Sequence, residues 1–226
     1  MNLLVLGCGK TGSLVAEVAR ERGYDVRVLR SRDNPQAAAL TPKYLQDIDV
    51  AIDFTNPQAV IFNIEACVRA GKNMVVGTTG WYSELPRIRA LVESAGLGFV
   101  HATNFSIGVN LFLQIAAASA AALKHGYFGQ IFERHHVHKK DAPSGTALSI
   151  QETLKRGSGT EVEITSFREG EVVGMHELVF ESPNDDIYLC HDAKSRRGFA
   201  EGAVRAAKWV ADKQGVYDFR DIWQLL

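Results

Sequence analysis

Hydrophobic residues in the first hundred positions follow two alternating periods. Short apolar runs predict strands at 2–6, 25–29, 50–54, 73–77 and 98–102. Apolar residues at helical spacing predict intervening helices at 10–22, 57–70 and 83–94. Strands that alternate with helices are typical of βαβ units, which build a parallel sheet covered on both faces.

The pattern changes after Asn104. A long apolar stretch predicts a buried helix at 107–124, and another helix is expected to begin near Ser144. Strand-like runs occur at 129–136, 161–168, 176–181 and 186–191. No helical pattern separates the last three, so we expect a mixed sheet in a second, α+β domain at 106–198. A final alanine-rich helix, predicted to end at Gly215, is expected to return within 199–226 to the first domain, 1–105.

Composition and charge narrow the class of protein. The 226 residues are 46% hydrophobic and 23% charged, as in ordinary globular proteins. A net charge of -1 gives no overall basic field, so no nucleic-acid partner is expected. The chain shows no uninterrupted run of about 20 apolar residues and no signal-peptide pattern. Scattered Cys8, Cys67 and Cys190 form neither a disulfide framework nor a CxxC pair. We therefore predict a cytoplasmic protein with no membrane partner.

A glycine motif lies between the first predicted strand and the first predicted helix. Its residues are Gly7, Cys8, Gly9, Lys10, Thr11 and Gly12, in the pattern GxGxxG. Glycines allow a tight turn and let a pyrophosphate approach the helix N-terminus, where free N–H groups favour anions. Tight strand–helix packing without a ligand is the alternative. The strand–turn–helix context predicts a Rossmann dinucleotide-binding domain in an α/β protein.

The end of the second strand bears on the choice of nucleotide. NAD-preferring sites usually carry an acid there, whereas this chain has Arg30, Ser31 and Arg32. Two arginines and a hydroxyl would bind a 2′-phosphate that an acid would repel. The preferred cofactor is therefore predicted to be NADPH, with NADH as the second choice. The alternative is that these are solvated loop charges.

Two further turns follow strands of the same predicted sheet. Asp53, Phe54 and Thr55 follow the third strand, and Gly77, Thr78 and Thr79 follow the fourth. Ligands of open parallel sheets bind beyond the carboxyl ends of the strands. We expect both turns to line the cofactor crevice, with ordinary turn chemistry as the alternative.

A cationic stretch marks the second domain. Residues 133–148 read ERHHVHKKDAPSGTAL, so histidines and lysines precede a predicted helix start at Pro143 and Ser144. First-turn N–H groups can hold a carboxylate or phosphate, which predicts an anion site. For His138 and Lys140 we favour the alternative that they are ordinary surface residues with no role in such a site. Zinc bound by the histidines and Asp141 is the rival interpretation; the adjacent lysines oppose a dication, so no metal is predicted.

These residues carry a resemblance to a known family. The segment 133–147, with HHxxK followed by DAPSGTA, resembles the signature of dihydrodipicolinate reductases. Further matching motifs lie at 7–12, 53–55, 77–80, 104–110, 168–176, 195–196 and 203–206. The resemblance implies a Rossmann domain, a mixed-sheet domain for substrate binding and oligomerisation, and a returning helix. It also implies reduction of 4-hydroxy-tetrahydrodipicolinate to tetrahydrodipicolinate by NADPH or NADH, in the diaminopimelate route to lysine.

The resemblance also implies roles for individual residues. His135 and Lys139 would form the catalytic acid pair. Substrate contacts would come from His136, Gly145, Thr146 and Arg196. Contacts to the nicotinamide end would come from Gly77–Thr79 and from Ala102, Thr103, Asn104 and Phe105.

Proton transfer gives the acid pair a physical rationale. Hydride addition leaves negative charge on the neighbouring atom, so a proton must follow, and a histidine with an ordinary pKa near 6.5 suits that task. Lys139 should lower the pKa of His135, while bound carboxylates should raise it. Substrate binding would then raise the pKa of His135 and favour its protonated form.

The sequence leaves two other functions open. Another Rossmann imine or amino-acid dehydrogenase, such as an aspartate dehydrogenase-like protein, or a non-catalytic NADP-binding module would share the architecture. The intact signature argues against both. The segment 154–161 is short where many family members carry a longer loop that takes part in tetramer contacts. A homo-oligomer, tetramer or dimer, is expected.

Overall fold

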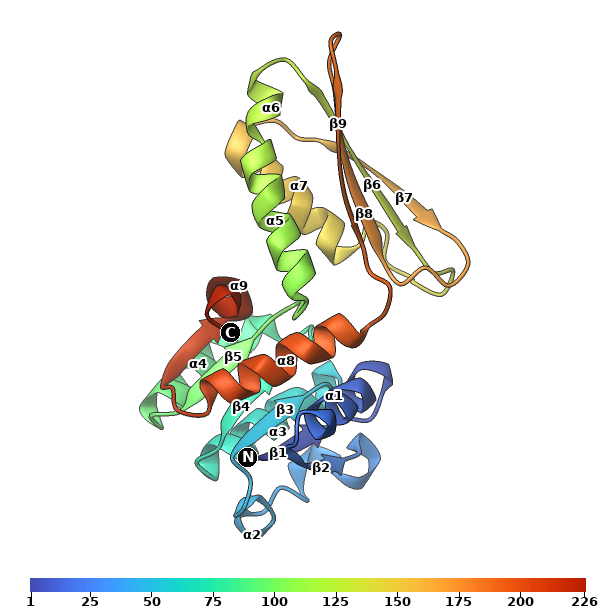
Figure 1. Ribbon diagram of the computed structural model, residues 1–226. Helices are drawn as coiled ribbons and strands as arrows, with labels where there is room; N and C mark the ends of the chain where they lie inside the picture. Colours follow the sequence, from blue (N-terminus) through green and yellow to red (C-terminus); the bar gives the residue numbers. More distant parts are fainter. The chain divides into compact units, whose positions relative to one another are not determined.

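The chain leaves its first structural unit once and returns to it. The computed structural model describes residues 1–226. Unit 1 comprises Met1–Ile107 and Arg197–Leu226, and unit 2 comprises Gly108–Arg196 (Figure 1).

Unit 1 is built on a parallel sheet with the strand order β10-β5-β4-β3-β1-β2. The strands are β1 (Asn2–Leu6), β2 (Asp25–Leu29), β3 (Val50–Asp53), β4 (Asn73–Val76), β5 (Gly98–His101) and β10 (Gly215–Asp218). The α-helices are α1 (Lys10–Glu21), α2 (Pro42–Leu45), α3 (Pro57–Arg69), α4 (Leu85–Ser94), α8 (Arg197–Val210) and α9 (Phe219–Ile222). Short 3₁₀ turns lie at η1 (Ser31–Asp33), η2 (Pro35–Ala37), η3 (Tyr82–Glu84) and η4 (Trp223–Leu225).

Both faces of this sheet are covered because alternate strand residues point to opposite sides. Leu3 and Val5 join a core with α1 and α8. Leu4 and Leu6 join a second core with α3 and α4. The α/β architecture with a doubly covered parallel sheet is therefore confirmed (Figure 1).

Helix α8 belongs to unit 1 and packs beside α1. A Cβ at Gly202 would lie 1.8 Å from the carbonyl oxygen of Phe105, so only glycine permits this approach. The predicted stop at Gly215 was wrong: α8 ends at Val210, and Gly215 begins β10, which pairs with β5. Four residues with one buried side chain, Val216, are too few to show a strand period.

Unit 2 combines two longer helices with a mixed sheet of order β7-β6-β8-β9. Strand β6 is parallel to β7 and antiparallel to β8, as a mixed sheet requires. Its elements are α5 (Ile107–Ser119), α6 (Ala121–Lys124), β6 (Phe128–His135), α7 (Gly145–Ser158), β7 (Glu163–Arg168), β8 (Met175–Glu181) and β9 (Asp186–Asp192). Apolar residues of α5 and α7 pack on one face of this sheet.

The predicted buried helix at 107–124 needs correction, because only one of its faces is buried. Phe112 and Ala116 pack in the core of unit 2, whereas Leu111 and Ile115 are 46% and 41% exposed. By length and composition alone, Ile107–Lys124 qualifies as a membrane-crossing helix, with mean hydropathy 1.5. Core helices of globular domains pass the same test, so this is weak support for a membrane span.

Candidate active site

Two glycines of the loop are packed closely against neighbouring backbone, whereas the third faces open space. Gly7 has φ +95°, and a Cβ there would lie 2.2 Å from the carbonyl oxygen of Phe54. A Cβ at Gly12 would lie 2.4 Å from the carbonyl oxygen of Gly7. A Cβ at Gly9 would meet no atom within 4 Å, and Gly9 caps α1 without a side-chain hydrogen bond. The N-terminus of α1 can therefore be approached closely by an anion.

A cavity of about 340 Å³ joins this loop to the turns after β3 and β4. It is lined by Gly9, Lys10, Thr11, Gly12, Phe54, Thr55, Asn56, Pro57, Gly77, Thr78 and Thr79. The structure thus brings together three predicted segments and adds Asn56 and Pro57, which sequence reasoning placed only in a helix cap. A Cβ at Gly77 would lie 2.2 Å from the Phe54 ring, so the turns also fit one another closely.

The Asp53 carboxylate stabilises these two turns. Its carboxylate is fully buried and accepts hydrogen bonds from the Thr55 N–H at 3.0 Å and the Thr78 hydroxyl at 2.6 Å. Asn63 donates to its other oxygen at 2.7 Å. Burial raises the pKa of Asp53, while these donors act in the opposite direction. The Asp53 side chain therefore supports the two turns, and any cofactor contact at this position would be made by its backbone.

The remaining predicted cofactor residues differ in accessibility. Arg30, Ser31 and Arg32 follow β2 directly and are exposed, as are Cys8 and Thr103. The side chains of Ala102 and Phe105 are buried in the core, so any cofactor contact from them would be made by their backbone. Asn104 accepts a hydrogen bond from the Ser106 N–H at 2.8 Å.

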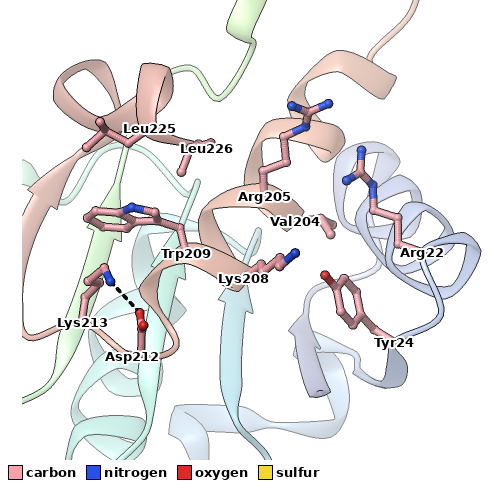
Figure 2. A pocket seen from close by; sticks show the side chains of 10 residues that line it. All are labelled: Arg22, Tyr24, Val204, Arg205, Lys208, Trp209, Asp212, Lys213, Leu225 and Leu226. Carbon is pink, nitrogen blue, oxygen red and sulfur yellow. Dashed lines mark ion pairs between the residues drawn. The ribbon is translucent and has the colours of Figure 1, made fainter.

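A second cavity of unit 1, about 420 Å³, lies between α8, the end of α1 and the chain terminus (Figure 2). Its cations are partly engaged: Lys213 pairs with Asp212 at 2.9 Å, and Arg22 pairs with Glu201. Tyr24 lines it just before β2 begins, at the amino end of the sheet. Open parallel sheets bind ligands at the opposite end, so the glycine-loop cavity is the better candidate for a nucleotide.

In unit 2, the cationic stretch connects a strand end to a helix start. Strand β6 ends at His135, and α7 begins at Gly145 with Ser144 as its N-cap. The Ser144 hydroxyl accepts from the Ala147 N–H at 3.2 Å. Gly145 and Thr146 occupy the first turn, where an α-helix presents N–H groups without intrahelical acceptors.

Two further cations lie in the same part of unit 2. Arg196 Nη2 is 3.1 Å from His136 Nε2, although these residues are sixty positions apart. Lys139 Nζ pairs with the Asp141 carboxylate at 2.8 Å, and its side chain keeps 23% of its exposure. His138 is largely exposed and stands 3.9 Å from Glu171. The structure thus associates Arg196 with His136 and leaves His138 on the surface.

His135 is a buried histidine held by a carboxylate. Its Nδ1 is hydrogen-bonded to Glu133, and its residue exposure is 7%. Burial lowers the pKa of His135, and the charges of Lys139 and Arg168 lower it further, against the opposing effect of Glu133. Lys139 therefore acts in the expected direction, but burial is the larger cause.

Sequence reasoning missed Glu133. Its carboxylate is fully buried, contacts His135 and accepts from Arg168 Nη2 at 2.8 Å. The available signal was the strand period: residues two apart, such as 133 and 135, share one face of a strand. A charged residue on the buried face of a strand is expected to have a partner, and the sequence alone places Glu133 on the same face as His135.

Glu133, His135 and His176 also offer ligand atoms within 4.8 Å of one another. The carboxylate, however, already binds Arg168, and His176 Nε2 lies 3.1 Å from the Ser144 hydroxyl. A dication there would have to displace the guanidinium and lie beside Lys139. We therefore interpret this group as a hydrogen-bonded cluster.

His176 should make the protein sensitive to acid. Burial lowers its pKa from 6.5 to about 3, so the unfolded chain binds a proton that the folded chain does not. Stability should therefore fall as pH decreases below about 6.5, by roughly 2 kcal/mol at pH 5. Chemical denaturation at pH 7 and pH 5 should show a smaller difference for His176→Asn than for the parent chain. The exposed His138→Asn should behave like the parent, and equal pH differences in all three would contradict the assignment.

The fold and these two groups of residues define a class: a Rossmann protein with a glycine loop at the start of α1 in one unit and a group of cationic side chains near a helix start in the other. Comparison with known proteins then identifies the family. The family model described as "Dihydrodipicolinate reductase, N-terminus" matches residues 1–105, and that of the C-terminus matches residues 108–223. The chain belongs to the dihydrodipicolinate reductase family and is an NAD(P)H-dependent oxidoreductase.

Individual relatives agree with this assignment. The chain is 35% identical to the 4-hydroxy-tetrahydrodipicolinate reductase of Christiangramia forsetii, covering 98% of this chain and 97% of the relative. It is 38% identical to the enzyme of the same name from Thiobacillus denitrificans, over 84% of this chain and 76% of the relative. A dipicolinate-bound dihydrodipicolinate reductase from Paenisporosarcina sp. has the same fold, with a TM-score of 0.80 at 21% identity over 98% of this chain and 99% of that one.

The architecture is shared more widely. An amine dehydrogenase from Mycobacterium smegmatis matches with a TM-score of 0.62 at 11% identity, covering 97% of this chain and 95% of that one. Identity at that level shows the fold alone.

Proposed function

We propose that this chain reduces 4-hydroxy-tetrahydrodipicolinate to tetrahydrodipicolinate with NADPH, on the diaminopimelate route to lysine. The observation that carries the proposal is the contact between Arg196 and His136, in the same unit as Lys139 and the start of α7. The full-length match to reductases of that name supports it.

A pyridine nucleotide fits the cavity of unit 1. The tight glycine loop leaves the N-terminus of α1 accessible at Gly9, and Thr55 and Thr78 border the same space. When bound, the reduced nicotinamide supplies a hydride. The loop N–H groups would hold the pyrophosphate, and Lys10 would add a positive charge beside it.

The residues of unit 2 divide the remaining work. Arg196, His136 and the first turn of α7 would hold the substrate carboxylates, because guanidinium groups and helix N–H groups bind such anions well. His135 and Lys139 would supply the proton that follows hydride transfer. Since burial lowers the pKa of His135, the anionic substrate would restore its proton affinity on binding.

A coupled assay tests this function. The unstable substrate is generated in situ from pyruvate and aspartate semialdehyde by the upstream synthase, and oxidation of NADPH and NADH is followed separately. We expect synthase-dependent turnover with NADPH. No turnover with either nucleotide would exclude the proposed reaction.

Nucleotide preference gives a separate prediction. Arg30 and Arg32 are exposed directly after β2, where they would contact a 2′-phosphate. The double variant Arg30→Ala/Arg32→Ala should lose at least about 100-fold in kcat/KM for NADPH, because it removes two charged hydrogen bonds and each contributes about 1.5–3 kcal/mol. Values for NADH should change little. Arg69→Ala, an exposed arginine of α3, is the control, and faster NADH than NADPH turnover by the parent chain would contradict the proposal.

We also propose that the chain forms a homo-oligomer, dimer or tetramer. On the sheet face directed away from α5 and α7, Phe128 is 59%, Phe167 36% and Tyr188 61% exposed. An exposed apolar face of this kind is typical of a protein interface. Molar mass in solution decides between monomer and oligomer.

A further inference from the structure

We infer that Glu133, held in place by Arg168, positions His135: the carboxylate fixes a proton on Nδ1 and directs Nε2 toward the reacting group. The inference deepens the proposed function, on which its catalytic consequence rests. Glu133 would not touch the substrate itself. It would act through the imidazole, as a positioning residue.

Strand register surrounds Glu133 with polar residues of the neighbouring strands. It lies opposite Ser166 of β7 and His176 of β8, and His135 lies opposite Arg168. Side chains that are paired across a sheet share one face, and this face is the one covered by the helices of unit 2. The carboxylate is fully buried, and a buried charge persists only with partners.

Each partner of the carboxylate has a distinct task. Arg168 Nη2 donates to one carboxylate oxygen at 2.8 Å, and the other oxygen bonds His135 Nδ1. Hydrogen bonds from Arg168 and Ser166, with the charge of His135, keep the pKa of Glu133 below its usual value despite burial. An ionised carboxylate can only accept, so Nδ1 must carry the proton. Nε2 is then the ring nitrogen that exchanges a proton with the substrate.

The surroundings of Nε2 fit this role. A Cβ at Gly174 would lie 3.0 Å from Nε2, so glycine at this position leaves space beside that atom. Arg168 also donates to the carbonyl oxygen of Asp141, in the loop that carries Lys139. One guanidinium therefore connects the support of His135 with the loop of its proposed acid partner.

The isosteric variant Glu133→Gln gives a sharp test. Arg168 offers only donors, so the single amide oxygen of glutamine should turn to the guanidinium and its NH₂ should face Nδ1. Nδ1 must then accept, which moves the proton of the neutral ring to Nε2. Long-range ¹H–¹⁵N spectra of the histidine-labelled full chain, without ligands, should show the Nδ1–H tautomer in the parent and the Nε2–H tautomer in the variant.

The same variant should change the kinetics in a characteristic way. Without the anion the imidazolium loses stabilisation, so the alkaline limb of the kcat/KM profile should move to lower pH by about one unit or more. kcat should fall by about 10- to 10,000-fold, the range covered by outer carboxylates that orient an active-site histidine. KM for the nucleotide should stay within about two-fold, because the nucleotide cavity belongs to unit 1.

Two controls separate positioning from structural support. Glu169→Gln breaks a 3.0 Å ion pair between Glu169, which directly follows β7, and Arg134 of β6, and it should change neither the tautomer nor kcat. Glu133→Asp keeps a carboxylate and should restore part of the tautomer preference and of kcat. If Glu133→Gln does not fold, the tautomer of the parent chain and the data for Glu133→Asp still test the positioning role of Glu133.

An Nε2–H tautomer in the parent chain would overturn the inference, as would an unchanged tautomer and kcat in Glu133→Gln. The spectra need no substrate, so their outcome is independent of the reaction. A parent chain with the expected tautomer but no turnover would remove the proposed function and leave the positioning role intact.

Discussion

Replacing Lys139 by alanine should lower kcat by about 100- to 10,000-fold, the usual range for loss of a general acid–base group. Lys139 comes from the loop between β6 and α7 and carries a charge that reaches His135. Its loss would remove a proposed proton source and a positive charge that acts on His135. Stopped-flow or steady-state oxidation of NADPH in the coupled assay measures the effect.

Binding of the nucleotide should be nearly unaffected in Lys139→Ala, because the glycine-loop cavity lies in unit 1. Stability should also change little, since the ion pair with Asp141 is partly exposed. The neighbouring and exposed Lys140 provides the matched control, and Lys140→Ala should keep the parent kcat. Full kcat in Lys139→Ala would exclude Lys139 from the mechanism.

Gly12→Ala should raise the dissociation constant for NADPH by at least about 10-fold and also destabilise the fold. The new Cβ would lie 2.4 Å from the carbonyl oxygen of Gly7 and 3.0 Å from its carbon, and backbone cannot yield as a flexible side chain does. Overpacking of this kind costs about 1–3 kcal/mol and would separate α1 from β1. Calorimetric titration with NADPH and thermal melting measure the two effects.

Two other glycines separate affinity from stability. A Cβ at Gly9 meets nothing within 4 Å, so Gly9→Ala should keep the melting temperature but lose affinity, because the methyl group occupies the approach to α1. A Cβ at Gly198 would meet only Ser106 Oγ at 3.6 Å. Gly198→Ala should therefore lower neither the melting temperature nor the affinity for NADPH. Unchanged NADPH affinity in both loop variants would exclude the loop as the nucleotide site.

The predicted elements of the first domain match the structure closely because their signals are local. Strand β1 begins and ends where its apolar run does, and α3 begins after Asn56 because that side chain caps the helix at Gln58 and Ala59. Strand β10 was missed for the complementary reason. Its four residues pair only with β5, more than a hundred positions earlier, and carry little pattern of their own.

The candidate site of unit 2 was also partly predictable from the sequence, since its cations and the start of its helix are neighbours in residues 133–148. The sequence did not reveal the support beneath it. Glu133 contacts Arg168, and Ser144 contacts His176, each across more than thirty positions. These contacts depend on how distant segments of the chain pack against one another, which no local sequence pattern records.

The sequence alone thus determined the βαβ order, the glycine loop and the residue types of the reactive stretch, because helical and strand periods and turn chemistry act over a few residues. Tertiary structure decided which of those residues lie in contact with one another. It buried Asp53 beneath the turns, associated Arg196 with His136 and set a carboxylate behind His135. Those roles depend on burial and on contacts between distant segments, which exist only once the chain has folded.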